Sequence, residues 1–198
     1  MAKRKVILIT DGDTVAKETI EEVAQQVGGR CISRSAGNPT PLSGFSLVDL
    51  IKEALHDPVL VMFDDCGSVH EGDGEKALKI VATHPDIEVL GAIAVASNCP
   101  NSKGIPVQFA LDRFGQVVKH RVDKYGNVME EEPPHIYGDT VEVLNDLSIP
   151  IIIGMGDVGK MGKRDNREIG APVTRKAVQL ILEHHQKNYL HKNKTRLD

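Results

Sequence analysis

The chain has 198 residues, of which 40% are hydrophobic, and a formal net charge of −4. This length and apolar content suit one domain with a sizeable core. The acidic balance, Lys+Arg 24 against Asp+Glu 28, provides no basic field for non-specific DNA or RNA binding. No apolar run approaches the roughly 20 residues of a transmembrane helix, and the run after the basic N-terminus stops too early for an export signal. We therefore expect a soluble protein.

Apolar, β-branched runs alternate with helical patterns along the chain. Runs typical of strands covered on both faces lie at 6–10, 31–33, 59–63, 89–96 and 149–153. Helical spacing of apolar residues predicts helices over 14–27, 46–55 and 75–83, a short helix after Asp139, and a last helix from Pro172. The alternation predicts an α/β fold with a mostly parallel, doubly wound sheet of about five strands, similar to flavodoxin or receiver folds.

Residues 104–134 interrupt this rhythm. Two segments in it, 112–117 and 123–128, both read aspartate, cation, aromatic, glycine, amide, valine. Each copy predicts a turn, and the alternating residues around them predict a small antiparallel β-arm inserted in the fold. We favour a hairpin that caps a sheet edge, and a homo-oligomer contact is the alternative. Residues 187–198 are expected to form a frayed basic tail of a single domain spanning 1–198.

Acidic pairs follow two of the predicted strands. Asp11 and Asp13 come after the first strand, and Asp64 and Asp65 after the third. In doubly wound sheets ligands bind beyond the carboxyl ends of the strands, and grouped carboxylates suit Mg²⁺ or Ca²⁺. The four aspartates are therefore candidate metal ligands. The alternative is structural, because Asp13 can cap the following helix and Asp65 can shape a turn.

A glycine-rich, cationic loop follows the last predicted strand. The run from Gly154 to Lys163 fits the spacing of a dinucleotide-binding loop, but about a dozen residues separate it from the next helix, which disfavours a nicotinamide cofactor. Its backbone N–H groups and lysines could instead hold a small anion, with a solvated loop as the alternative. The candidate anion-binding residues are Gly154, Gly156, Gly159, Lys160 and Lys163.

Other reactive residues give weaker signals. Ser97 follows the fourth strand, and together with the aspartates and Lys160 it is similar to the receiver arrangement of metal ligands, phospho-acceptor, hydroxyl and lysine. The three cysteines lack zinc-site spacing, as expected of reduced thiols. Cys66 as a nucleophile is disfavoured by the two aspartates before it.

Three stretches, Val6–Asp13, Val61–Asp65 and Gly154–Lys163, resemble the soluble stage V sporulation protein AE family of endospore-forming bacteria. The resemblance implies a spore protein encoded beside membrane proteins that move dipicolinic acid with calcium into the spore and release it at germination. It further implies synthesis in the cytoplasm, a peripheral place at the spore inner membrane, and those membrane proteins as partners.

These observations lead to ranked expectations. The first is a non-enzymatic accessory of dipicolinic acid transport, whose acidic pairs and glycine loop hold calcium dipicolinate or a magnesium nucleotide. The second is a Mg-dependent, receiver-like phospho-acceptor or phosphoryl-transfer enzyme. The third is an oligomerising structural protein of the spore.

Overall fold

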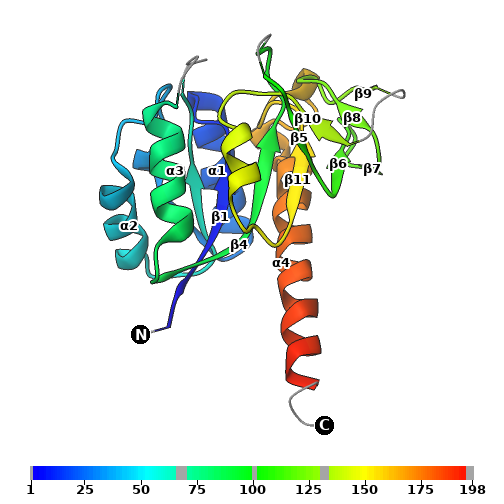
Figure 1. The fold of residues 1–198 in the computed structure, drawn as a ribbon. Helices are drawn as coiled ribbons and strands as arrows, with labels where there is room; N and C mark the ends of the chain where they lie inside the picture. Colours follow the sequence, from blue (N-terminus) through cyan, green and yellow to red (C-terminus); the bar gives the residue numbers. More distant parts are fainter. Residues whose placement is uncertain (1, 66–70, 100–101, 130–133, 195–198) are drawn as a thin grey trace.

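The structure, a computed structural model, describes residues 2–65, 71–99, 102–129 and 134–194 (Figure 1). Within these residues a seven-stranded sheet has the order β2-β3-β1-β4-β11-β6-β7. Its strands are β1 (Arg4–Ile9), β2 (Arg30–Cys31), β3 (Val59–Met62), β4 (Ile87–Val95), β6 (Phe109–Leu111), β7 (Val117–Val118) and β11 (Ile152–Met155). Neighbours pair in parallel except β6 with β7, which form an antiparallel hairpin at one edge. The predicted α/β class and mostly parallel sheet are confirmed.

The strand order places β1 inside the sheet, between β3 and β4. The five predicted strands follow the order 2-3-1-4-5, whereas flavodoxin-like sheets have the order 2-1-3-4-5. From β1 the chain winds toward β2 and β3 on one side, then crosses to β4 and β11 on the other. The winding direction therefore reverses between β1 and β4, which is where ligands bind in such sheets.

Four α-helices cover the sheet in the described part of the chain. Helices α1 (Thr14–Gln26) and α4 (Pro172–Lys194) pack on one face, and α2 (Gly44–Glu53) and α3 (Asp73–Thr83) pack on the other. The strands between them are buried on both sides, which is why their sequences are apolar without alternation. Short 3₁₀ helices join these elements: η1 (Ser33–Ser35), η2 (Glu142–Asp146), η3 (Met161–Lys163) and η4 (Arg167–Ile169).

Several element ends differ from the predictions for local reasons. Strand β11 begins at Ile152 and not at Ile149, because Pro150 has no N–H to donate to a ladder. Helix α2 is capped by Ser43, which accepts from the N–H of Ser46, and not by Ser46 itself. The short helix expected after Asp139 is the 3₁₀ helix η2. Helix α4 continues to residue 194 and extends past the sheet, beyond residue 187, where the tail was expected to begin (Figure 1).

The insertion at 104–134 is more closely joined to the sheet than a free arm. Its strand β6 pairs in parallel with β11, while β5 (Ile105–Pro106) pairs with β10 (His135–Ile136), and β8 (Arg121–Val122) with β9 (Val128–Met129). The two repeated segments form the same turn, in which the aspartate Oδ1 accepts two backbone N–H bonds. Its role as a contact between copies, and the single domain spanning 1–198, stay predictions.

Candidate functional site

The loops after β1, β3, β4 and β11 line one small cavity of about 180 Å³, which we call the strand-end cavity. It lies where the winding direction reverses, and the N–H of Val95 on β4 donates to Thr10 Oγ1 on the β1 side at 2.9 Å. The described lining residues are Thr10, Asp11, Asp13, Asn38, Asp64, Val95, Ser97, Asp139, Asp157 and Lys160. Two predicted groups, the aspartates after β1 and one of those after β3, therefore meet.

Asp11 is a strongly perturbed carboxyl group of the strand-end cavity. Its side chain is buried, and its Oδ1 accepts one long hydrogen bond, 3.4 Å, from the N–H of Asp13. Burial, followed by the negative charge of Asp13, raises the pKa of Asp11 to about 7, although Lys160 opposes this rise. Near neutral pH, Asp11 is thus a carboxyl group that readily gains or loses a proton.

Asp13 has two structural tasks. Its Oδ1 caps α1 by accepting from the N–H of Ala16 at 2.8 Å, and its Oδ2 accepts from Lys160 Nζ at 2.6 Å. Burial acts to raise the pKa of Asp13, but the bonds from Lys160 and Ala16 together hold that pKa below its ordinary value. Asp13 therefore stays ionised beside the titrating Asp11.

Lys160 carries the positive charge among the described residues of the strand-end cavity. Besides Asp13, it approaches Asp157 Oδ2 at 3.5 Å. Burial tends to lower the pKa of Lys160, but its hydrogen bond to Asp13 and the charge of Asp157 raise that pKa overall. Asp157, whose own pKa is raised by burial, was not among the predicted metal ligands, although its place just after β11 is the same signal that selected the others.

Asp64 and Asp65 point in different directions. Asp64 lines the strand-end cavity and packs closely on the loop after β1. A β-carbon added at Gly12 would lie 3.0 Å from the Cβ of Asp64. Asp65 instead accepts from the N–H groups of Gly74 at 2.6 Å and Glu75 at 2.8 Å, at the beginning of α3. Burial raises the pKa of Asp65, and these bonds oppose the rise. Asp65 thus has a structural use, but as an acceptor at the beginning of α3; the turn expected after it lies outside the described residues.

The residues predicted to bind an anion have different uses in the structure. Gly154 and Gly156 make room for close packing, since a β-carbon there would lie 2.5 Å from Ile136 and 2.7 Å from Lys124, respectively. Gly159 has φ +74 and donates its N–H to Asp165 Oδ2 at 3.0 Å. The Lys160 ammonium group is paired with Asp13 and lies near Asp157. The backbone N–H groups that were expected to surround an anion are thus partly used within the protein.

Asp165 is a buried residue that the sequence reasoning missed. It is fully buried and accepts from the N–H groups of Val173 and Thr174 and from Thr174 Oγ1, at 2.8, 2.9 and 2.6 Å, besides Gly159. Burial raises its pKa, and these donors oppose the rise. Asp165 thereby caps α4 and fixes the end of the glycine loop. No local pattern marks it, because a helix cap is expected directly before Pro172 and Asp165 lies seven positions earlier.

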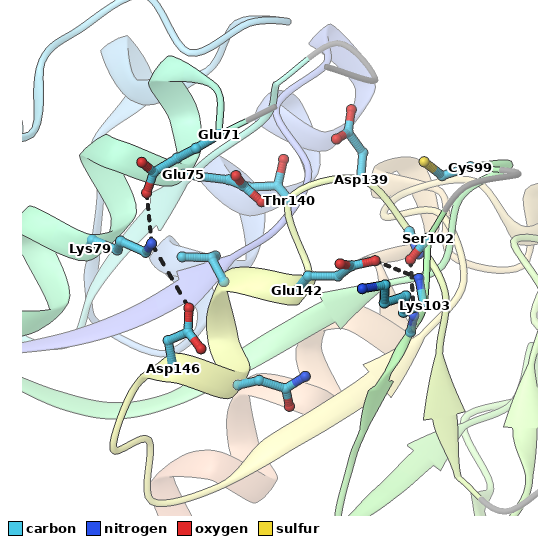
Figure 2. A pocket seen from close by; sticks show the side chains of 14 residues that line it. Glu71, Glu75, Lys79, Cys99, Ser102, Lys103, Asp139, Thr140, Glu142 and Asp146 are labelled. Atoms are coloured by element: carbon cyan, nitrogen blue, oxygen red, sulfur yellow. Dashed lines mark hydrogen bonds and ion pairs between the residues drawn. The ribbon is translucent and has the colours of Figure 1, made fainter. Parts of the chain in front are cut away.

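A larger pocket of about 450 Å³ adjoins the strand-end cavity and shares Asp139 with it (Figure 2). Its acidic side chains come from α3, from η2 and from the loops before them, and Lys79 lies between Glu71 at 2.6 Å and Asp146 at 3.9 Å. Burial, with the charges of Asp65 and Glu71, raises the pKa of Glu75. The two adjoining cavities therefore present mainly negative charge.

Metal-ligand geometry sets a limit on this site. Across the part of the chain that the structure describes, no group of three or more His, Cys, Asp or Glu side chains is arranged to hold a metal ion. Any ion here would be held by one or two carboxylates, with water completing its shell, as is usual for Mg²⁺. Cys66 lies outside the described residues. Burial raises the pKa of the Cys31 thiol to about 12, so that thiol stays protonated.

Comparison with known families decides the biological context. The model of the stage V sporulation protein AE1 family matches residues 5–185, which include every strand-end loop described above. The chain belongs to this family. The predicted family is thus confirmed, and a role in sporulation comes with it. No curated protein and no solved structure gives a significant match. None of the helices in the described residues of this family member could span a membrane.

Proposed function

We propose that this sporulation protein is a non-enzymatic accessory that binds a divalent cation in the strand-end cavity, Ca²⁺ or Mg²⁺, together with an acidic ligand such as dipicolinate. The observation that carries the proposal is the meeting of Asp11, Asp64 and Asp157 in one cavity where Lys160 is already paired with Asp13. Negative charge is thereby in excess. A cation would offset the repulsion that helps to raise the pKa of Asp11.

The donor set fits a hard cation. Carboxylates and the hydroxyls of Thr10 and Ser97 supply oxygen, the ligand atom that Mg²⁺ and Ca²⁺ prefer. Asp11 and Asp64 are the carboxylates that would hold the ion, because both line the strand-end cavity, whereas Asp65 lies at the beginning of α3 and Asp13 is paired with Lys160. The ion would supply positive charge for an anionic ligand that these aspartates alone would repel.

Family membership supports the cellular part of the proposal. We place the protein peripherally at the spore inner membrane, beside the membrane proteins of dipicolinic acid uptake and release, in sporulation and at germination. Recovery of those membrane proteins with a tagged copy of this chain from detergent-solubilised spore membranes is the expected result. Their absence, when a tagged subunit of the transport complex recovers the others, would contradict the partnership.

Calorimetric titration tests the cation site directly. We expect Ca²⁺ or Mg²⁺ to bind with release of protons, because cation binding lowers the pKa of Asp11. Asp64→Asn should weaken binding about tenfold or more, since it removes one of the charged ligands. Asp73→Asn is the matched control, because Asp73 is an exposed aspartate on α3 away from the cavity. No heat with either cation, with or without dipicolinate, would reject the site.

A second function is favoured by one specific observation. Asp11, Asp13, Asp64, Ser97 and Lys160 all line the strand-end cavity, which are the residue types of a receiver-like phospho-acceptor site. The different strand order and the existing pairing of Lys160 with Asp13 rank it second. Incubation with acetyl phosphate and Mg²⁺, followed by intact-mass measurement, would reveal an added phosphoryl group. That group should be absent from the Asp64→Asn variant.

A further inference from the structure

A further pocket, of about 330 Å³, lies between the first turn of the insertion and the beginning of α4. We call it the basic pocket, because every charged residue in its described lining is a cation. The lining residues are Arg113, Phe114, Lys163, Arg164, Ile169, Pro172 and Val173. None of them lines the strand-end cavity, so the two sites are separate and of opposite charge.

The cations of the basic pocket are held in place by defined contacts. The guanidinium of Arg164 lies over the ring of Phe114 at 4.4 Å, and that of Arg113 lies 5.9 Å from the same ring. Arg113 also donates to Asn127 Oδ1 at 3.1 Å. Such stacking fixes the plane of a guanidinium and leaves its edge N–H groups free to bind an oxyanion. The two arginines are thus pre-oriented.

Arg113 retains an unused donor. Its Nε is buried and has no hydrogen-bond partner among the described residues. Buried donors in native proteins are nearly always paired, so the guanidinium of Arg113 has hydrogen-bonding capacity that the described residues do not use. An oxyanion at the remaining guanidinium nitrogens would offset this loss of hydrogen bonding.

The loop that delivers the other cations has a strained backbone. Lys163 has φ +67, a left-handed conformation that a side chain with a Cβ rarely adopts. Gly162, the residue before it, packs closely on Arg113. A β-carbon at Gly162 would lie 2.7 Å from Arg113 Nη2. This conformation brings Lys163 and Arg164 to the same pocket as Arg113, although the three positive charges repel one another.

Apolar surface completes the basic pocket. Phe114 and Ile169 are both 61% exposed, and Pro172 and Val173 line the pocket beside them. The pocket therefore combines cationic side chains, which can bind the charged group of a ligand, with exposed apolar side chains, which can contact an uncharged part of the same ligand. A bare ion such as inorganic phosphate would use only the first of these features.

We propose that the basic pocket binds a ligand in which an oxyanion, a carboxylate or a phosphate, is attached to an apolar body. Arg113, Lys163 and Arg164 bind the oxyanion, and Phe114, Ile169 and Pro172 contact the body. A small aromatic carboxylate and the headgroup of an anionic lipid share this chemistry. The inference does not depend on cation binding in the strand-end cavity.

The test uses the full chain and three probes: isophthalate, inorganic phosphate, and phosphatidylglycerol vesicles with phosphatidylcholine vesicles as their control. We expect isophthalate or the anionic vesicles to bind more tightly than inorganic phosphate, and the probe that binds identifies the source of the oxyanion. Arg164→Gln should weaken that binding about tenfold or more, because a charge-assisted donor is lost. Phe114→Leu should weaken it less, since apolar area remains while the guanidinium loses its stacking partner.

The matched control is Arg175→Gln, which removes one exposed arginine from α4 outside the pocket lining. Circular dichroism spectra and melting temperatures of all variants establish that they are folded. Equal binding by Arg164→Gln and the unmodified chain would overturn the proposal. So would binding of phosphate as tight as that of both other probes, or binding of none.

Discussion

Lys160 Nζ donates to Asp13 Oδ2 at 2.6 Å, which joins the loop after β11 to the cap of α1 across 147 positions of sequence. The pKa of Asp13 is lowered from 3.8 and that of Lys160 is raised from 10.5. The pair therefore stabilises the fold between about pH 4 and pH 10, and this stabilisation is lost when either group becomes neutral.

Lys160→Met should raise the pKa of Asp11 above about 7, because the positive charge of Lys160 acts to lower it. The free energy of unfolding at pH 8 should fall by about 1 kcal/mol, a modest change since both partners of the pair are more than one-third exposed. Carbon-detected NMR titration of the aspartates and urea unfolding measure the two effects. Lys79→Met, at an exposed pair with Glu71, should leave the pKa of Asp11 unchanged.

Asp11 should make the fold less stable as the pH rises. Its pKa is about 7 in the folded chain against an ordinary value of 3.8, so the folded state binds more protons between pH 4 and pH 7. Asp11→Asn, which stays neutral, should therefore be more stable than the unmodified chain at pH 8, by at most about 4 kcal/mol. Near pH 4 the difference should disappear. Denaturant unfolding at both pH values is the measurement, and a difference independent of pH would be incompatible with a buried, titrating Asp11.

Asp165→Ala should be strongly destabilising. The substitution removes the acceptor of four hydrogen bonds and leaves the N–H groups of Gly159, Val173 and Thr174 buried without a partner. We expect a loss of about 2–4 kcal/mol in the free energy of unfolding. Asn166→Ala is the neighbouring control: it removes the cap of the short, exposed helix η4 and should cost less than about 1 kcal/mol. Similar losses in the two variants would argue against the central place given to Asp165.

The repeated turns of the insertion provide a matched pair of glycines. Gly115 and Gly126 have φ +74 and +73, but a β-carbon at Gly115 meets nothing closer than 3.8 Å, whereas one at Gly126 would lie 2.8 Å from the backbone N of Arg113. Gly115→Ala should therefore cost about 1 kcal/mol for the left-handed backbone alone. Gly126→Ala should cost clearly more, because it separates two packed turns. Thermal melting compares them, and equal costs would show that the turns do not constrain one another.

The sheet was predictable because buried parallel strands have an unmistakable apolar composition. The placement of the acidic pairs at strand ends was also predictable, but the meeting of the β1 and β3 loops depends on the strand order, which the sequence does not show. The divergence of Asp64 and Asp65 had a signal that was not used: successive residues of an extended chain point to opposite sides.

Other parts of the site depended on tertiary structure. Asp139 reaches the strand-end cavity only because the insertion returns along β10, and no local pattern predicts that path. The glycines at 154 and 156 suggested an anion site, but close approach of the insertion explains them. Spacing alone does not distinguish a backbone that must approach a ligand from one that must approach another backbone.

Lys160 and Lys163 belong to one loop, yet the first lines the strand-end cavity and the second lines the basic pocket. Gly159, the residue before Lys160, is bonded to Asp165, and both Met161 and Lys163 have a left-handed backbone. Only Met161 and Gly162 separate the lysines of two oppositely charged sites. If an occupant of one site shifts this loop, thermodynamic reciprocity requires that each occupant change the affinity of the other by the same factor.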